Sequence, residues 1–327
     1  MIHCHRGNVL VPLGLTHRCL DEHGQALRWA RAAGSPEFEA LALSGLGDGH
    51  YLLGRMRSSC GHFDRCVERC RANELRRIEG ASLAMRGATR FYSLEIRPAI
   101  DDVRAALDLA IRVGNRRAEA IARNVLGYLL HYAGEYEQAG SAARDGLALA
   151  RALGSKRFEI KSLLNLGLAL GGLGQWEAAE RALDEATAVA QASGVDFWAP
   201  WTLGALALAA CDDDKRRSAL AQAEDLLARG GVGHGHLHFR ELALETALAR
   251  RDPEAVEHHA RRLESFTRDE PLAWSDFLVT RARALSRLHQ GLADASDRRL
   301  LERLREQALA VGLAHGLAEI VEAHRDG

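Results

Sequence analysis

The stretch that decides the fold reads Ser162-Leu-Leu-Asn-Leu-Gly167-Leu-Ala-Leu-Gly-Gly-Leu-Gly174-Gln-Trp176-Glu-Ala-Ala179. Its apolar residues recur at helical spacing up to Gly172, and Gly174-Gln-Trp176 is typical of a tight turn. Residues 177–192 then form a second amphipathic pattern, which Gly194 ends. The stretch therefore predicts two antiparallel helices joined by a short turn.

The same pattern recurs every forty residues. Ala30-Arg-Ala-Ala-Gly34-Ser-Pro-Glu-Phe38-Glu39 matches Ala150-Arg-Ala-Leu-Gly154-Ser-Lys-Arg-Phe158-Glu159 at three times that interval. Small residues also form columns forty apart, which are Gly7, Gly47, Gly87, Gly127 and Gly167, then Gly14, Gly54, Gly134 and Gly174, then Cys19, Ser59, Ala99, Ala139, Ala179 and Ala219. Small side chains allow helices to cross closely, and a lone pair cannot bury its apolar face, so we expect the units to stack.

One copy of the repeat, Leu166-Gly167-x-x-Leu170, Gly174-x-Trp176-x-x-Ala179, Leu183 and Ala186, resembles the tetratricopeptide motif. Leu126-Gly127 with Gly134-x-Tyr136-x-x-Ala139 is a second copy. The usual unit is about 34 residues long, so the longer unit implies longer helices. The resemblance implies an all-α, right-handed superhelical solenoid of antiparallel helix pairs. Long units are also similar to the C-terminal arms of bacterial signal-transduction ATPases, including maltose-activator-like regulators and multidomain adenylate cyclase/ATPase proteins.

We expect three parts within one solenoid. Regular forty-residue repeats span residues 1–228, a flexible Gly/His-rich loop spans 229–236, and degenerate repeats with a terminal helix span 237–327. About seven or eight helix pairs and almost no strand should result. Met1 falls inside a unit, which predicts a chain that once continued upstream or a truncated gene model.

Composition restricts the function. The chain has 327 residues, 43 basic and 44 acidic, for a net charge of -1, so the global basic field of a nucleic-acid binder is absent. Only Lys156, Lys161 and Lys215 are lysines, and none follows a glycine as a Walker A loop requires. No GxSxG or HExxH motif occurs. These features predict a protein that is not an enzyme and uses no cofactor.

A cluster of soft ligands is the best metal candidate, Cys60-Gly-His62-x-x-x-Cys66-x-x-x-Cys70. In the repeat, however, Cys66 and Cys70 align with alanine and glycine, which favours small packing residues over a zinc site. His234, His236 and His238 are interpreted as part of a solvated loop. The acidic column Glu39, Glu79, Glu119 and Glu159 falls in the first turn of each unit's first helix, where it complements the helix dipole; a ladder for a basic ligand is the alternative.

The tetratricopeptide resemblance implies that the first helix of each pair lines a concave groove. Groove positions lie six and three residues before the repeated glycine and one, four and five after it. Of the residues at these positions, we predict partner binding by Asp48, Tyr51, Phe91, Tyr92, Asn124, Tyr128, His131, Tyr132 and Lys161. Four of the five tyrosines are in this set, and tyrosine is frequent at interfaces; the alternative is that the rings fill space between neighbouring helices.

These observations predict a protein–protein interaction scaffold that holds a peptide or helix segment in the groove, without direct nucleic-acid or membrane binding. Replacing Tyr128 and Tyr132 with alanine should abolish binding without unfolding the protein. No apolar run reaches the ~18–20 residues that span a bilayer, and no secretory signal is visible, which predicts a cytoplasmic protein. The alternative is the sensor or regulatory arm of a multidomain ATPase or adenylate cyclase-type regulator whose catalytic domains lie outside this chain.

Overall fold

A computed structural model describes residues 2–10 and 15–316, and all regular structure within these residues is helical. Its helices are α1 (Ile2–Leu10), α2 (Thr16–Ala32), α3 (Pro36–Leu52), α4 (Met56–Ala72), α5 (Arg76–Arg90), the short 3-10 helix η1 (Phe91–Ser93), α6 (Ile96–Arg112), α7 (Arg116–Tyr132), α8 (Tyr136–Ala152), α9 (Lys156–Gly172), α10 (Trp176–Ser193), α11 (Ala199–Ala209), α12 (Asp213–Ala228), α13 (Gly233–Ala249), α14 (Pro253–Thr267), α15 (Ala273–His289) and α16 (Ala295–Val311).

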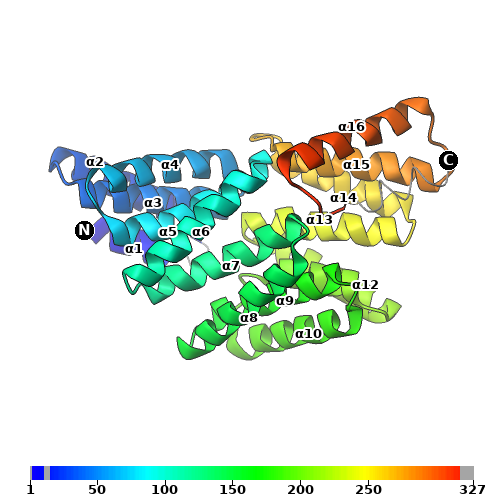
Figure 1. Ribbon diagram of the computed structural model, residues 1–327, viewed down its shortest axis with the longest axis horizontal. Coiled ribbons are helices and arrows are strands. Elements are labelled where there is room, and N and C mark those ends of the chain that lie inside the picture. Colours follow the sequence, from blue (N-terminus) through cyan, green and yellow to red (C-terminus); the bar gives the residue numbers. More distant parts are fainter. Residues whose placement is uncertain (1, 11–14, 317–327) are drawn as a thin grey trace.

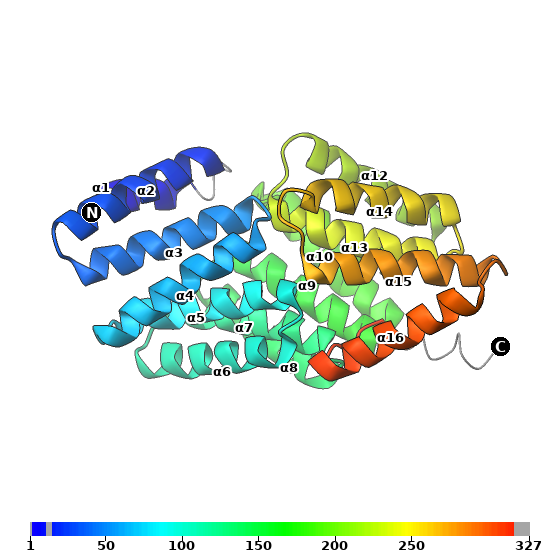
Figure 2. The ribbon, with the colours of Figure 1, turned by 90° about the horizontal axis from the view of Figure 1, so that it is seen from above.

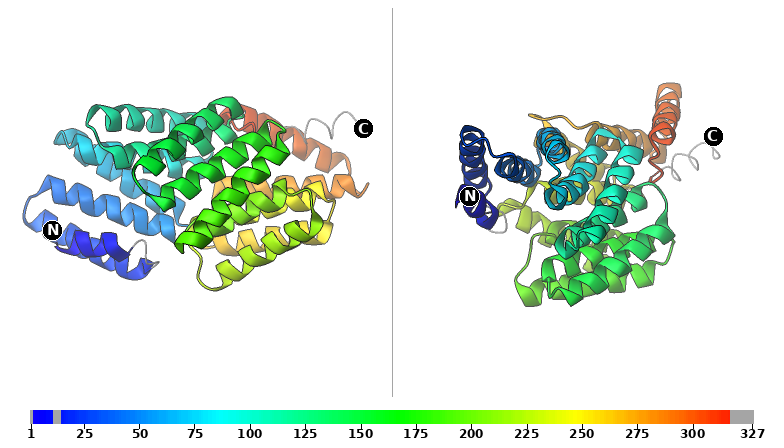
Figure 3. Two further views of the ribbon diagram at one scale, coloured as in Figure 1. Left: turned by 90° about the horizontal axis from the view of Figure 1, so that it is seen from below. Right: turned by 60° about the vertical axis from the view of Figure 1, so that its left-hand side comes forward.

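Consecutive helices pack as antiparallel pairs that wind into a superhelix (Figure 1). The odd-numbered helices from α3 to α15 also contact one another in order, so that they form its inner layer. Most of their even-numbered partners lie on the outside (Figures 2 and 3). The predicted all-α, right-handed superhelical solenoid is therefore confirmed.

Helix starts follow the repeat. Helices α3, α5, α7 and α9 begin at residues 36, 76, 116 and 156. The glycines between units adopt a left-handed backbone, as at Gly34 and Gly154 with φ of 62° and 64°. Gly87 has a different cause, because a Cβ there would lie 2.6 Å from the carbonyl oxygen of Ala99 on α6.

The register changes at α11, upstream of the predicted boundary at residue 228. This helix begins at Ala199 and ends at Ala209, six residues shorter than α9. Asp214 occupies the column in which Gly174 makes a turn. The chain turns earlier instead, and the Asp212 side chain caps α12 by accepting a hydrogen bond from the Lys215 backbone N–H at 2.7 Å.

The loop predicted over residues 229–236 is shorter than expected, because α13 begins at Gly233. There the chain meets the α3–α4 turn so closely that a Cβ on Gly233 would overlap the backbone of Gly54. His234 and His238 are fully buried, and His236 stacks on Phe266, so the interpretation as a solvated loop is wrong. Apolar rings cover these histidines. The forty-residue repeat contains no feature that predicts their burial.

Helices α13 and α15 close the superhelix. The inner helix α13 returns to contact α3, and α15 contacts η1. Glu270, in the α14–α15 connection, accepts hydrogen bonds from the backbone N–H groups of Arg57 and Ser58 at 2.8 and 3.3 Å. Its other oxygen accepts from the Ser58 hydroxyl at 2.5 Å. A residue more than two hundred positions away therefore caps α4, whose own N-cap residue provides no side-chain cap.

The acidic column ties neighbouring helices together. Glu39, Glu79, Glu119 and Glu159 are all buried. Three of them pair with an arginine eight residues earlier, as Arg31–Glu39 at 3.1 Å and Arg151–Glu159 at 3.0 Å show. Each pair joins the last turn of one helix to the first turn of the next. The column therefore fits the helix-terminus interpretation, extended by ion pairs.

The side chains of the candidate zinc cluster do not come together as one site. Cys66 and Cys70 are fully buried beside Ala40 and Leu43, as small packing residues are. The Cys66 thiol donates to the carbonyl oxygen of Ala40 at 3.2 Å, whereas His62 stacks on His50 with ring centroids 5.1 Å apart.

None of the helices within the described ranges is both long and apolar enough to cross a membrane.

Candidate functional site

A pocket opens among the inner helices where the regular repeats end. It has about 940 Å³ of space free of protein atoms, its open mouth included. Helices α3, α5, α7 and α9 provide most of its walls, and the segment before α11 provides Phe197 and Trp198. Five predicted groove residues line it, which are Asp48, Tyr51, Asn124, Tyr128 and Lys161. Five of the nine predicted groove residues therefore converge there.

Lys161 lies at the inner side of the pocket, with 3% of its surface exposed. Its Nζ lies 3.1 Å from the ring centroid of Trp201, 5.0 Å from that of Trp198 and 5.1 Å from that of Tyr128. Among the described residues it has no hydrogen-bond partner. Burial holds the pKa of Lys161 well below its usual value of 10.5, because the charged form is poorly solvated there.

Two arginines and one carboxylate define the outer part. Arg117 is exposed and Arg157 is half-buried, with its guanidinium 3.9 Å from the ring centroid of Phe197. Burial raises the pKa of Asp48 to about 6, and the positive charges of Arg157 and Arg117 oppose that rise. The pocket therefore carries two arginines and a buried lysine against a single acidic side chain.

Asn124 is held in place by the neighbouring helix α9. Its Oδ1 accepts from the Ser162 hydroxyl at 2.9 Å, and its backbone oxygen accepts from Asn165 Nδ2 at 2.7 Å. Its own Nδ2 is buried without a hydrogen-bond partner in the described part of the chain. The amide thus keeps a donor available at the pocket wall.

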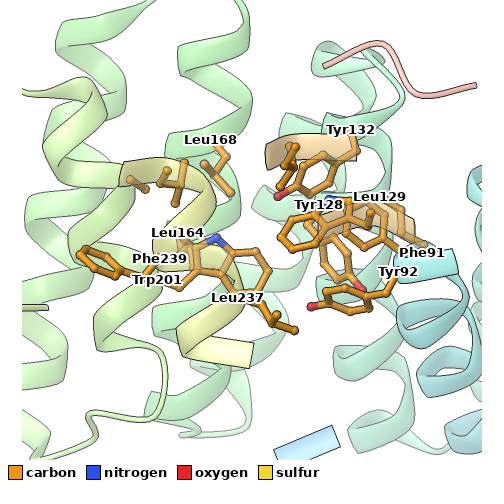
Figure 4. Packing of buried hydrophobic residues seen from close by; sticks show 14 of the residues in the cluster. Phe91, Tyr92, Tyr128, Leu129, Tyr132, Leu164, Leu168, Trp201, Leu237 and Phe239 are labelled. Carbon is orange, nitrogen blue, oxygen red and sulfur yellow. The ribbon is translucent and has the colours of Figure 1, made fainter. Parts of the chain in front are cut away.

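Phe91, Tyr92 and Tyr132 do not line the pocket, which corrects their assignment as partner-binding residues. They are buried against α13 and α15, because the closing superhelix fills this part of the concave side. The Tyr92 hydroxyl lies 2.7 Å from His238 Nε2, and the Tyr132 hydroxyl lies 3.2 Å from Nδ1 of the same ring. Figure 4 shows the rings of Phe91, Tyr92 and Tyr132 packed together beside Trp201. The space-filling alternative is therefore the correct one for them.

Tyr132 also takes part in a buried network. Its hydroxyl donates a hydrogen bond to Glu241, and His238 stacks flat on Trp201 with centroids 3.4 Å apart. Burial raises the pKa of Glu241 to about 8. Replacing Tyr132 with alanine would open a cavity and remove the hydroxyl donor of this carboxyl group, which would keep only His238 Nδ1 at 3.1 Å. We therefore expect the double alanine variant to be destabilised.

His131 faces a different cavity. It packs against Tyr136 and His315, with ring centroids 5.4 and 4.5 Å away, in a largely apolar space lined also by Trp176 and Leu242. Burial lowers the pKa of His131 well below its usual value. The structure therefore separates it from the five groove residues that meet in the first pocket.

Sequence reasoning missed several lining residues, among them two arginines and two aromatic residues. Arg117 and Arg157 lie ten residues before the repeated glycine, one helical turn before the outermost position that was considered. Extending the groove face by that turn would have found them. Phe197 and Trp198 lie where the register changes, and the repeat pattern carried no signal for them.

Three possible metal ligands do come together elsewhere. Glu224, His258 and His259 have ligand atoms within 4.8 Å of one another, the only such group among the residues that the structure describes. Arg240 donates a hydrogen bond to Glu224 and lies 3.0 Å from His259 Nδ1. The guanidinium already satisfies the carboxylate and opposes a cation, so this arrangement fits a structural ion pair.

Comparison with solved structures finds proteins of similar fold. A Rap protein complexed with competence and sporulation factor matches with a TM-score of 0.62 and 15% identity, over 94% of this chain and 78% of that one. The Rap conjugation gene regulator of plasmid pLS20, in complex with the Phr* peptide, matches with a TM-score of 0.62 and 12% identity, over 88% of this chain and 80% of its own.

Aspartyl phosphate phosphatase F from Bacillus subtilis matches with a TM-score of 0.58 and 15% identity, over 88% of this chain and 75% of its own. No protein-family model and no curated protein sequence matches the chain. At these identities the similarity shows the fold alone. The chain has the architecture of these helical-repeat proteins.

Proposed function

We propose that this chain is a non-catalytic scaffold that binds a short peptide segment in the pocket between α3, α5, α7, α9 and the start of α11. The observation that carries the proposal is the pocket itself, where aromatic walls surround polar groups that have no partner among the residues that the structure describes. Ligand sites typically combine mostly apolar walls with a few such convergent polar groups.

The pocket's size limits what it can hold. Its roughly 940 Å³ includes the open mouth, so only part of a bound ligand would be enclosed by the walls. This space suits a few residues of an extended segment, with aromatic contacts from Tyr51, Phe197 and Trp198. A longer partner would contact the rim with its remaining residues.

Two of the similar solved structures support this function, since one contains competence and sporulation factor and the other the Phr* peptide. We extend the proposal to a bacterial cytoplasmic protein of signal transduction that acts by binding. The regulatory arm of a multidomain ATPase or adenylate cyclase-type protein stays an alternative prediction. The mass of the native protein in its source cells separates the two, because a free-standing scaffold has the 35.7 kDa of this chain.

The test uses two pools of random N-acetylated hexapeptides, one ending in a free carboxylate and one in a carboxamide. Each pool is incubated with the protein, and bound peptides are separated by gel filtration and identified by mass spectrometry. We expect the protein to enrich a subset of sequences. Ala81→Trp, which places an indole in the pocket, should abolish that enrichment.

Ala152→Trp is the matched control, because Ala152 is exposed at the end of α8. It should enrich the same sequences as the unmodified protein. The proposal fails if neither pool is enriched, or if Ala81→Trp enriches the same peptides while remaining folded by circular dichroism.

A further inference from the structure

The cavity beside His131 is separate from the first pocket and lies at the carboxyl ends of α7 and α9. It has about 1010 Å³ of space free of protein atoms, its open mouth included. The acidic residue on its wall, Glu245, forms an ion pair with Arg281. Most of the wall is apolar, with contributions from Leu168, Leu183, Leu208, Leu242 and Ala249. The cavity therefore suits an apolar occupant.

The cavity exists because one repeat lacks two large side chains. The positions of His131 and Tyr132 are taken forty residues later by Gly171 and Gly172. Both glycines line the cavity, and a Cβ on Gly171 would lie 3.2 Å from Cζ3 of Trp176. Protein interiors are close-packed, so a space left by two missing rings is normally filled by another segment.

The exposure of Trp176 is unusual for its place in the repeat. Met56 and Ile96 occupy the same position in earlier units, and both are fully buried. Trp176, on the cavity wall, is 45% exposed. A large exposed ring beside an apolar cavity indicates a surface that something else covers.

The last described residues lead the chain into this cavity. Helix α16 runs back toward the end of α7 (Figures 1 and 2), where the N–H groups of Ala314 and His315 donate to the carbonyl oxygen of Tyr132 at 2.9 and 3.0 Å. The carbonyl oxygen of Gly316 accepts from Arg281 at 2.9 Å. His315 and Gly316 themselves line the cavity. Because consecutive Cα atoms are about 3.8 Å apart, residue 317 starts beside the cavity wall.

Residues 317–327 lie outside the described part of the chain, and their sequence is Leu-Ala-Glu-Ile-Val-Glu-Ala-His-Arg-Asp-Gly. Leu317, Ile320 and Val321 are three and four residues apart, which is the spacing of one apolar helix face. The two glutamates of the segment fall on the opposite face. The sequence thus offers an apolar face directly after the residue that enters the cavity.

We propose that residues 317–327 dock into this cavity of their own chain, with Leu317, Ile320 and Val321 turned toward Trp176. A segment tethered directly at the site has an effective concentration on the order of mM, which favours it over the same segment of a second copy. The docking does not depend on peptide binding in the first pocket.

Acrylamide quenching of tryptophan fluorescence tests the docking in the full chain. Trp29 and Trp176 are 64% and 45% exposed, and each of the other three tryptophans is at most 9% exposed, so Trp29→Phe leaves Trp176 as the main reporter. In that background, Leu317→Asp with Ile320→Asp places charges on the docking face. We expect the quenching constant to rise at least about twofold, because the indole loses its apolar cover.

Glu319→Gln with Glu322→Gln is the matched control, because it changes the opposite face and should leave the quenching constant unchanged. An aspartate variant that is quenched like its Trp29→Phe parent overturns the inference. Strong quenching of both proteins would mean that the cavity stays open, and weak quenching of both would mean that a different molecule fills it.

A photo-crosslinker provides a second measurement that leaves the apolar face intact. Ile320→p-benzoylphenylalanine should, on irradiation, form links within one chain to residues 167–176 or 205–209, identified by mass spectrometry of the digested protein. The same substitution at Glu322 should not form them. Links that join two chains would assign the cavity to a second copy, and the absence of links to either wall would also overturn the inference.

Discussion

Single residues show how far the repeat constrains the backbone. Glu74 and Leu94 occupy columns in which other units have glycine, and both adopt the same left-handed conformation, with φ of 55° and 62°. The helix geometry therefore imposes the turn even where the residue is unsuited to it. A left-handed conformation costs a residue with a side chain roughly 1 kcal/mol relative to glycine.

Glu74→Gly should therefore stabilise the protein by up to about 1 kcal/mol, since Glu74 is exposed and loses little else. Chemical denaturation followed by circular dichroism measures the change. The reverse substitution gives the control: Gly154→Ala, with φ of 64° and no atom within 4 Å of the added Cβ, should lose about as much. A destabilised Glu74→Gly protein would contradict the argument.

Individual residues also show how much of the site could be predicted from the sequence. Periodicity correctly placed Asp48, Tyr51 and Lys161 on one face, because position within a helix determines direction. It could not show that α13 would cover Phe91 and Tyr132, because that contact joins segments more than a hundred residues apart. Burial by a distant helix leaves no local pattern.

At the scale of helices, local signals predicted starts and ends well and register changes poorly. The forty-residue spacing of α3, α5, α7 and α9 follows from turns that carry glycine before α3, α7 and α9 and are visible in the sequence. The short α11 was missed, because its end depends on the Asp212 cap in place of glycine. The α4 cap was also missed, since Glu270 supplies it from the other end of the superhelix.

Glu270→Ala should destabilise the protein by about 0.5–2 kcal/mol, the usual cost of a lost helix cap. Urea denaturation measures it, and hydrogen exchange should rise first at the start of α4. Asp269→Ala is the matched control, because Asp269 is 75% exposed and its pairing with Arg55 lies at the surface. Equal effects of the two variants would show that the cap contributes nothing.

The whole molecule carries an acid-sensitive set of histidines. Burial is the largest cause that lowers the pKa to about 4 in five of them, which are His23, His62, His236, His259 and His315. An unfolded histidine takes up its proton near pH 6.5. Between pH 6.5 and 4 the unfolded state therefore binds more protons than the folded state, and the free energy of unfolding falls as the pH falls.

We expect the midpoint of thermal unfolding to decrease steadily from pH 6.5 to 4 at constant ionic strength. His62→Gln removes one of these groups from a half-buried position and should make the decrease shallower. Scanning calorimetry in matched buffers measures both slopes. A midpoint that stays constant across this interval would refute the role of the histidines.

Closure of the superhelix also affects the order in which the protein is made. Phe91, Tyr92 and Tyr132 leave the ribosome well before α13 and α15, which cover them. At about 5–20 residues per second, Trp274 follows Tyr132 by roughly 7–30 s. During that time an aromatic surface of the nascent chain is exposed to water. We therefore expect the incomplete solenoid to bind a chaperone that recognises apolar segments.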